Sequence, residues 1–336
     1  MRKTVLFFRV FKRLSGGDVK VWHYFNHVLA SPAHRPLISF SRGSVWDESN
    51  PWRDHREHVV PGNVRSADVL FVSGSDWLRL PLAERRSSSV PVIHLVQGLR
   101  AHTEPTASGY GFLPFRAIRI SVGEELTEAL DATGRINGPL FTIPSAIDAS
   151  EVRALAGEAK RDIDLLIVAT KAAPYPGVPG VLDSPPALGR ALLPRLAGPN
   201  RRVELIDGQL SRPEFLRLVR RARVTLFLPY RVEACPLAPL EGMATGTLVV
   251  CPDCVGNRSY CIPGWNAFRP EYEEEAIVAA AEEALAGAES LAPLMAERAA
   301  ATLRERDLGA ERTAFLDVLD RAEELWREAW PRQPAS

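Results

Sequence analysis

A chain of 336 residues is long enough for two α/β domains of ordinary size, or for one large one. Its content of 46% hydrophobic and 24% charged residues excludes a globally disordered chain. Lys+Arg and Asp+Glu both total 41, so net charge provides no general attraction to nucleic acid or to a membrane surface.

Charge and histidine are unevenly divided along the chain. Residues 1–150 hold 18 Lys/Arg against 14 Asp/Glu, and the remainder holds 23 against 27. All seven histidines fall in the first part: His23, His27, His34, His55, His58, His94 and His102. The division indicates two units with different duties, with chance clustering as the alternative.

The N-terminus carries no recognisable targeting signal. Its apolar run, residues 4–8, stops at Arg9 and is too short for a signal peptide. No stretch approaches the roughly 18–20 apolar residues of a membrane span. We therefore expect a cytoplasmic protein without a transmembrane segment, whose four cysteines are free thiols.

In the first half, short β-branched runs alternate with amphipathic segments, a pattern typical of a parallel sheet covered by helices. The predicted strands are residues 4–9, 37–41, 68–72, 90–96, 117–121 and 140–143. The predicted helices include 18–29 and 124–132. These strands are sufficient for one doubly wound domain.

Residues 144–160 interrupt this pattern, and a second series follows. Its predicted strands are 164–169, 202–206, 224–228 and 248–251, with helices at 185–196, 213–222 and 237–244. The proline-rich residues 172–186 predict a loop. From residue 273 the pattern is helical, and it ends in one amphipathic helix, 311–330, that contains Trp326 and Trp330. The expected fold is α/β, with two doubly wound domains at 1–150 and 151–310 and a terminal segment at 311–336.

The most informative passage, residues 224–268, includes V-T-L-F-L-P-Y-R-V-E-A-C-P-L-A-P-L-E-G-M-A-T-G-T-L-V-V. It predicts a strand, a loop, a helix beginning near Pro236 and another strand. Glu233 precedes the helix, and Glu241 lies within it. The loop is expected at the carboxyl edge of the sheet, where a helix N-terminus favours phosphate. Carboxylates beside such a site suit the hydroxyl groups of a ribose and a hexose.

This passage resembles the E-x7-E signature of retaining GT-B glycosyltransferases of the group 1, or family 4-like, type. The resemblance implies two Rossmann-like domains facing a cleft, with the terminal segment 311–336 packing back on the first domain. It assigns the acceptor to residues 1–150 and the nucleotide-sugar donor to residues 151–310. It implies that Glu233 contacts the transferred sugar and that Glu241 contacts the ribose.

Other segments match motifs of the family, in the same order along the chain. Ser15-Gly16-Gly17 resembles the family's Gly-Gly loop, T-I-P-S-A-I-D its I-P-N-G-I-D, and V-G-N the end of its donor motif. The donor-binding residues implied are Gly16, Gly17, Lys171, Arg231, Cys235, Pro236, Leu237 and Glu241. The catalytic residues implied are Glu233, Gln97 and Lys171.

Two departures from the family pattern concern charge and proton transfer. Lys171 stands where the family has Arg, and Pro176 stands where it has Lys. Lys160, Arg161 and Arg231 are candidates to replace the lost cation. Gln97 stands where many relatives have His, and it cannot act as a base. His94 and His102 are candidates on the acceptor side, although His94 also fits a buried strand position.

Two further sequence patterns resemble metal-binding motifs. Asp162-Ile163-Asp164 resembles a D-x-D metal motif, but it precedes a strand, which favours a charged strand start. Cys251, Cys254 and Cys261, with Cys235, suggest zinc or redox chemistry. Free thiols are favoured because no histidine lies in this half of the chain.

The resemblance therefore predicts a retaining, metal-independent, hexosyltransferase-like enzyme that uses a nucleotide-diphosphate sugar and no cofactor. The acceptor is a glycan, a lipid-linked sugar or a small molecule. No nucleic-acid partner is expected, and peripheral membrane contact stays open. The alternatives are a catalytically silent GT-B protein that binds a sugar or a partner, and another GT-B chemistry such as that of an epimerase or a phosphorylase.

Overall fold

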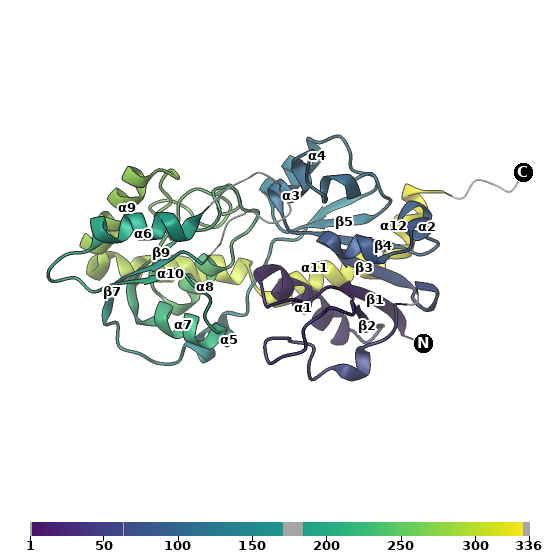
Figure 1. The fold of residues 1–336 in the computed structure, drawn as a ribbon, viewed down its shortest axis with the longest axis horizontal. Helices are drawn as coiled ribbons and strands as arrows, with labels where there is room; N and C mark the ends of the chain where they lie inside the picture. Colours follow the sequence, from purple (N-terminus) through teal and green to yellow (C-terminus); the bar gives the residue numbers. More distant parts are fainter. Residues whose placement is uncertain (1, 63, 171–183, 332–336) are drawn as a thin grey trace, which may run out of the picture. The chain divides into compact units, whose positions relative to one another are not determined.

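The computed structural model describes residues 2–62, 64–170 and 184–331, and it divides into two compact units (Figure 1). Unit 1 comprises Met1–Ser145 with Gly309–Ser336, and unit 2 comprises Ala146–Leu308. Each unit holds a parallel sheet covered by helices. None of the helices in the described ranges is long and apolar enough to cross a membrane.

Unit 1 is built on a six-stranded parallel sheet with the order β2-β1-β3-β4-β5-β6. Its strands are β1 (Lys3–Arg9), β2 (His34–Phe40), β3 (Val69–Ser73), β4 (Val92–Val96), β5 (Ile118–Ser121) and β6 (Leu140–Thr142). Its helices are α1 (Gly16–Leu29), α2 (Leu82–Ser87), α3 (Leu99–Thr103), α4 (Glu124–Asp131), α11 (Leu308–Asp320) and α12 (Ala322–Ala329). Four 3₁₀ turns complete it: η1 (Arg56–His58), η2 (Val64–Ser66), η3 (Gly74–Arg79) and η4 (Tyr110–Phe112).

Unit 2 repeats the same winding with four parallel strands in the order β10-β9-β7-β8. They are β7 (Ile163–Val168), β8 (Val203–Ile206), β9 (Ala222–Phe227) and β10 (Leu248–Val250). The helices are α5 (Ala149–Ala156), α6 (Pro185–Leu196), α7 (Arg212–Arg221), α8 (Ala238–Thr245), α9 (Glu274–Ala286) and α10 (Ala288–Glu305). In both units the strand order reverses between the first and third strands, and such switch points are where open α/β sheets bind ligands.

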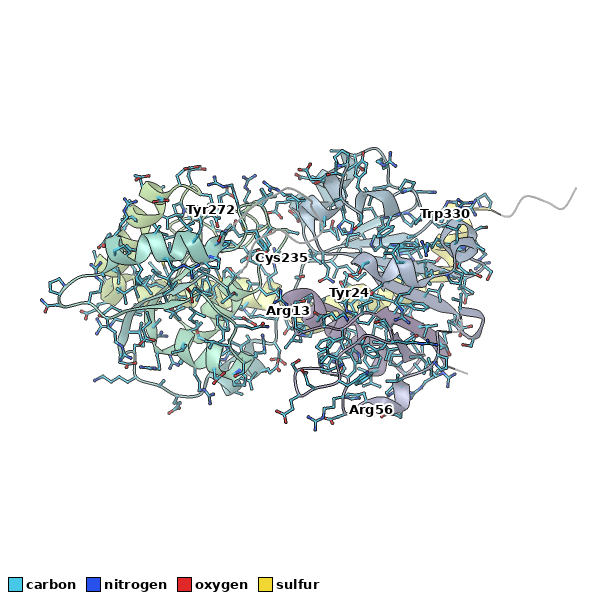
Figure 2. All side chains as sticks on the ribbon, viewed as in Figure 1. Arg13, Tyr24, Arg56, Cys235, Tyr272 and Trp330 are labelled. Atoms are coloured by element: carbon cyan, nitrogen blue, oxygen red, sulfur yellow. The ribbon has the colours of Figure 1, made fainter. Side chains whose placement is uncertain are left out.

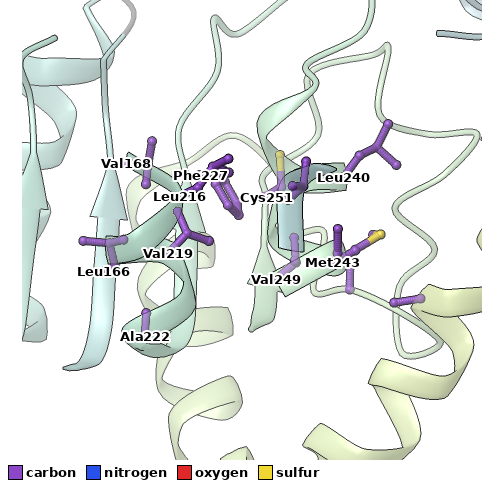
Figure 3. Packing of buried hydrophobic residues seen from close by; sticks show 14 of the residues in the cluster. Leu166, Val168, Leu216, Val219, Ala222, Phe227, Leu240, Met243, Val249 and Cys251 are labelled. Atoms are coloured by element: carbon purple, nitrogen blue, oxygen red, sulfur yellow. The ribbon is translucent and has the colours of Figure 1, made fainter. Parts of the chain in front are cut away.

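The sheet of unit 2 is apolar on both faces because its strands are continuous runs of buried residues. Leu166 and Val168 face a core shared with α5, α7, α8 and α10, part of which Figure 3 shows around Phe227 and Met243. Leu165 and Ile167 face the opposite core, shared with α6 and α9. This alternation fixes which face each helix covers.

Two predicted boundaries were wrong. Residues 144–160, expected to interrupt the pattern, contain α5, which Asp148 caps by accepting the amide N–H groups of Ser150 and Glu151 at 2.9 Å. The segment 311–330, expected as one helix, is divided into α11 and α12 at Arg321.

The division between α11 and α12 has a packing cause. Phe315 of α11 contacts Phe71 of β3, with ring centroids 6.0 Å apart. Trp326 of α12 packs on the cluster that contains Leu70 and Val72, which lie on the other face of β3. A straight helix cannot cover both faces of one sheet. Trp330 donates from its indole N–H to Asn137 Oδ1 at 3.0 Å, so the two tryptophans pack within unit 1.

A buried ion pair joins α11 to the first helix. Glu311 accepts from Lys20 Nζ through one oxygen, and its other oxygen lies 3.0 Å from His27 Nε2. All three side chains are almost fully buried. Burial by itself would raise the pKa of the Glu311 carboxyl, but Lys20 and His27 outweigh burial and lower this pKa to about 2. The returning C-terminal segment is therefore tied to α1 by charge as well as by apolar contact.

We predict that Glu311→Gln destabilises unit 1 by about 3–5 kcal/mol, because it breaks the buried ion pair with Lys20. A carboxyl whose folded pKa lies below its unfolded pKa stabilises the folded state fully above the unfolded value of 4.5. That stabilisation is lost as the pH falls toward about 2. Denaturant unfolding at several pH values, followed by tryptophan fluorescence, measures both effects.

The control is Glu323→Gln, which removes an exposed carboxylate of α12 whose partner is Lys3. This substitution should change stability by less than about 1 kcal/mol. Equal stability of the Glu311→Gln and Glu323→Gln variants would contradict the assignment.

Candidate functional site

The candidate site of unit 2 lies at its switch point, where the loops after β7 and β9 leave the carboxyl edge of the sheet. Lys171 and Pro176, which follow β7 in the sequence, lie outside the described residues. The loop after β9 contains Glu233, and α8 follows it with Glu241. The structure therefore places both glutamates of the sequence signature after the same strand.

Backbone hydrogen bonds fix the position of Glu233. Its amide N–H donates to Cys254 O at 2.9 Å, and its carbonyl accepts from the Gly256 N–H at 2.9 Å. The Glu233 carboxylate accepts from the Tyr230 N–H at 3.2 Å. The loop after β9 is thus joined to the loop after β10. The backbone of the loop after β9 also orients the Glu233 carboxylate.

The loop after β10 is strained where it meets Glu233. Val255 has a φ of 73°, in the left-handed region that a β-branched residue rarely adopts. At Gly256 an added Cβ would lie 1.9 Å from Ala234 O, so only glycine fits there. Asn257 completes the V-G-N sequence by donating to Pro252 O at 2.9 Å and accepting from the Cys254 N–H at 3.3 Å.

Glu241 lies in the first turn of α8 and is 5% exposed. Burial raises the pKa of its carboxyl above the usual range, and the guanidinium of Arg212 acts in the opposite direction. Arg212 donates to Glu241 Oε1 from the first position of α7. Sequence reasoning missed Arg212, because its place one residue after Ser211, the N-cap of α7, indicates only a helix start.

The helix after Glu233 begins at Ala238, one residue after the predicted start at 237. Cys235, Pro236 and Leu237 therefore form the end of the loop. Tyr260 donates its hydroxyl to Pro236 O from the following loop. Cys235 is half-buried (labelled in Figure 2). The N–H groups of the first helical turn follow directly, at the edge where a phosphate would lie.

Of the three candidate cations, Arg161 and Lys160 lie away from the carboxyl edge of the sheet. Arg161 donates to Thr245 O at 2.9 Å and Gly246 O at 2.7 Å, at the end of α8. Because Arg161 precedes β7, it lies at the amino edge of the sheet, as does Lys160, so neither compensates for the cation lost at Pro176. Arg231 lies 3.1 Å from Glu273 Oε1, and its guanidinium is 4.9 Å from the ring centroid of Tyr272 (labelled in Figure 2).

The remaining sequence patterns of unit 2 have structural roles. Asp162 forms ion pairs with Arg202 and Arg221 directly before β7, as a charged strand start predicts. The four cysteines are free thiols, and Cys251, Cys254 and Cys261 are buried. Burial raises the pKa values of Cys251 and Cys254 well above their usual range, which disfavours the thiolate needed for zinc or redox chemistry.

The corresponding edge of unit 1 holds Gly16 and Gly17, the first two residues of α1. An added Cβ at Gly16 would meet nothing within 4 Å, and at Gly17 it would meet Gln97 Oε1 at 3.6 Å, an ordinary contact. Gln97 Nε2 donates to Ser73 Oγ at 2.9 Å and to Gly17 O at 3.3 Å. The protein interior therefore does not require glycine at these two positions, and Gln97 lies directly beside them.

A charged cluster that sequence reasoning missed lies at the same carboxyl edge of the unit 1 sheet. Arg9, at the end of β1, lies 2.6 Å from Asp18 and 3.0 Å from Asp76. Asp18 also accepts from the Ser15 hydroxyl at the start of α1. Burial raises the pKa of Asp76 to about 6, although Arg9 opposes the shift. The three residues come from three separate segments, so no local pattern could reveal them.

The two histidines proposed on the acceptor side are core residues in the structure. His94 is fully buried, 5.4 Å from Trp77 between ring centroids. His102 is 3% exposed, with Nδ1 2.8 Å from Gly98 O. Burial lowers the pKa of His94 well below its usual value and that of His102 to about 4. Both are therefore neutral, and the structure favours the core interpretation of His94.

Comparison with known proteins agrees with this geometry. Residues 197–300 match the family model of glycosyl transferases group 1. Among curated proteins, no sequence matches significantly.

Solved structures match along nearly the whole chain. A glycosyltransferase from Rickettsia africae has 12% identity and a TM-score of 0.69, with 99% of this chain and 100% of that one covered. Anabaena Alr3699/HepE in complex with UDP-glucose has 13% identity and a TM-score of 0.70, with coverages of 94% and 99%. Sucrose-phosphate synthase from Thermosynechococcus elongatus has 13% identity and a TM-score of 0.68, with coverages of 96% and 100%.

The two doubly wound units and these likenesses define a protein of the GT-B fold. Within this fold, residues 197–300 of unit 2 carry the match to the group 1 glycosyl transferases.

We predict that Gly256→Ala destabilises unit 2 by about 1–3 kcal/mol, because the new methyl group meets the Ala234 carbonyl and the backbone must move. Thermal unfolding measures the change. Gly208→Ala is the matched control, since an added Cβ there meets nothing within 4 Å. If both variants unfold at the wild-type temperature, the proposed packing of the Glu233 loop against Gly256 is incorrect.

Proposed function

We propose that this protein is a retaining, metal-independent glycosyltransferase that transfers a hexose from a nucleotide-diphosphate sugar. The observation that carries the proposal is the placement of Glu233 and Glu241 after β9, at the switch point of unit 2. The family match of residues 197–300 and the UDP-glucose complex of the similar Anabaena structure support the donor class. Unit 2 then binds the donor, and unit 1 binds the acceptor.

The two carboxylates would have different duties. Glu241 is buried, and Arg212 holds one of its oxygens, so it forms a rigid acceptor for a ribose hydroxyl. Glu233 is half-buried on the preceding loop, with one oxygen on the Tyr230 N–H, and would orient the transferred sugar. Hydrogen bonds from substrate hydroxyls to carboxylates are charge-assisted and therefore strong.

The chemical step breaks the bond between the anomeric carbon and the diphosphate oxygen and forms a bond from that carbon to the acceptor oxygen. The acceptor proton passes to the departing phosphate oxygen, so no protein base is required. This is compatible with Gln97, which cannot take a proton. The first turn of α8 and Lys171 would stabilise the leaving diphosphate.

The decisive experiment incubates the protein with a panel of nucleotide sugars, beginning with UDP-glucose, with and without EDTA. Calorimetry should detect donor binding, and slow donor hydrolysis without acceptor should continue in EDTA. With an acceptor, the product should keep the anomeric configuration of the donor. No binding of any donor at millimolar concentration would refute the enzyme assignment and favour a silent GT-B protein. An epimerised donor, or a sugar phosphate formed with added phosphate, would assign another GT-B chemistry.

We predict that Glu241→Gln weakens donor binding roughly ten- to hundredfold, because it removes a charged hydrogen-bond acceptor. Glu233→Gln should lower turnover more than it lowers donor affinity, because the transferred sugar is the reacting group. Binding calorimetry and single-turnover rates separate the two effects. Glu275→Gln, an exposed change on α9, serves as the control. Wild-type binding and turnover in both site variants would overturn the assignment.

We also predict that Gly17→Ala preserves folding but impairs transfer. Alanine is the better helix former by about 1 kcal/mol and fits beside Gln97, so stability should not fall. A methyl group at this edge would obstruct a ligand, and turnover should fall at least about tenfold, or about 1.4 kcal/mol. Gly111→Ala, with nothing within 4 Å, is the control for both measurements. Unchanged turnover in Gly17→Ala would show that no ligand approaches this loop.

A further inference from the structure

The turn η1 of unit 1 gathers three side chains that are able to bind a metal ion. His55, Glu57 and His58 each offer one ligand atom, and these atoms lie within 4.8 Å of one another. The two histidines are half-buried, and Glu57 is exposed. The other five histidines of the chain are buried in the structure.

The hydrogen bonding of His58 indicates which of its ring nitrogens carries a hydrogen. Nδ1 lies 3.0 Å from Pro36 O, and a carbonyl only accepts, so Nδ1 carries a hydrogen. In a neutral ring, Nε2 then presents a lone pair. Nε2 lies 3.4 Å from Glu57 Oε1, and His55 Nδ1 lies 3.9 Å from the same oxygen. Nε2 of His58, Nδ1 of His55 and the Glu57 oxygen thus offer three ligand atoms to one cation.

The geometry suits a tetrahedral metal ion. Ligand atoms about 2.0–2.1 Å from zinc, at the tetrahedral angle, lie roughly 3.4 Å apart. The separation of Glu57 from His58 equals this value, and that of Glu57 from His55 exceeds it by 0.5 Å. Two imidazoles and one carboxylate form a ligand set that zinc accepts with water in the fourth position. The bond from His58 to Pro36 is the outer contact that orients a metal-binding histidine.

Aromatic rings pack against the two histidines, and another aromatic ring holds the Arg56 guanidinium. The His55 ring lies 5.1 Å from the Trp22 ring, and the His58 ring lies 5.7 Å from the Phe25 ring. Arg56, between the two histidines in sequence, has its guanidinium 4.7 Å from the ring centroid of Trp46 (Arg56 is labelled in Figure 2). The Arg56 guanidinium is therefore held against an aromatic ring.

We propose that His55, Glu57 and His58 form a binding site for a divalent transition-metal ion of the zinc class. The turn is joined to β2 through the Val60 N–H, which donates to Ile38 O at 2.9 Å. It lies beside the first half of β2, whereas Gly16, Gly17 and Gln97 lie at the carboxyl edge of the sheet. The ion would therefore stabilise the segment between β2 and β3 and would take no part in glycosyl transfer.

The test titrates the full-length protein, stripped with EDTA, with zinc in competition with a chromophoric chelator. One zinc ion should bind per chain. Glu57→Gln and His58→Gln should each weaken zinc binding at least about tenfold. Glu48→Gln, which removes an exposed carboxylate from the same segment, should leave the affinity unchanged. Zinc should also raise the unfolding temperature of the wild type but not that of Glu57→Gln.

Cobalt substitution identifies the ligand atoms. The expected spectrum shows d–d bands without thiolate charge transfer, because no cysteine belongs to the site. A thiolate band would assign the ion to the cysteines of unit 2 and overturn the proposal. Absence of zinc binding in the wild type, or wild-type zinc affinity in both Glu57→Gln and His58→Gln, would also overturn it.

Discussion

The candidate site depends most on the backbone crossing at Glu233. Two hydrogen bonds join the loop after β9 to the loop after β10, and they require the strained conformation of Val255 and a glycine at 256. Strain of this kind persists only where the surrounding structure over-determines it. Here it is held by Asn257, which bonds to the backbone of the same loop. The two backbone hydrogen bonds thereby give the Glu233 carboxylate a defined support.

Several buried charges in both units are paired with opposite charges from other elements. Glu241 is held by Arg212, Glu311 by Lys20 and His27, and Arg9 by two aspartates. Each of these charge pairs joins segments that are distant in sequence. The pairs therefore define how the segments pack more closely than apolar contacts alone would. Such pairs add little net stability but cost several kcal/mol when broken. The pairs join α8 to α7 and α11 to α1.

Much of the fold could be predicted because parallel strands buried on both faces are continuous apolar runs. β3, β4, β7 and β9 were recognised in this way, and the E-x7-E block was readable because Glu233 and Glu241 belong to one contiguous passage. The predictions were wrong where contacts between segments distant in sequence decide the structure. The break at Arg321 arises because α11 and α12 cover opposite faces of the same sheet. Arg161 resembled a phosphate ligand until its position at the amino edge was known.

The sequence by itself determined the alternation of strands and helices, the two-unit α/β architecture and the two glutamates at a strand end. These features are local, because they follow from periodicity, turn residues and spacing within one segment. The tertiary structure decided which groups accompany Glu233 and Glu241. Arg212 approaches Glu241 from another helix, the loop of Gly256 supports Glu233 from another strand, and His94 is enclosed by Trp77 and His102. Such contacts join residues that only the winding of the chain brings together, so no local pattern encodes them.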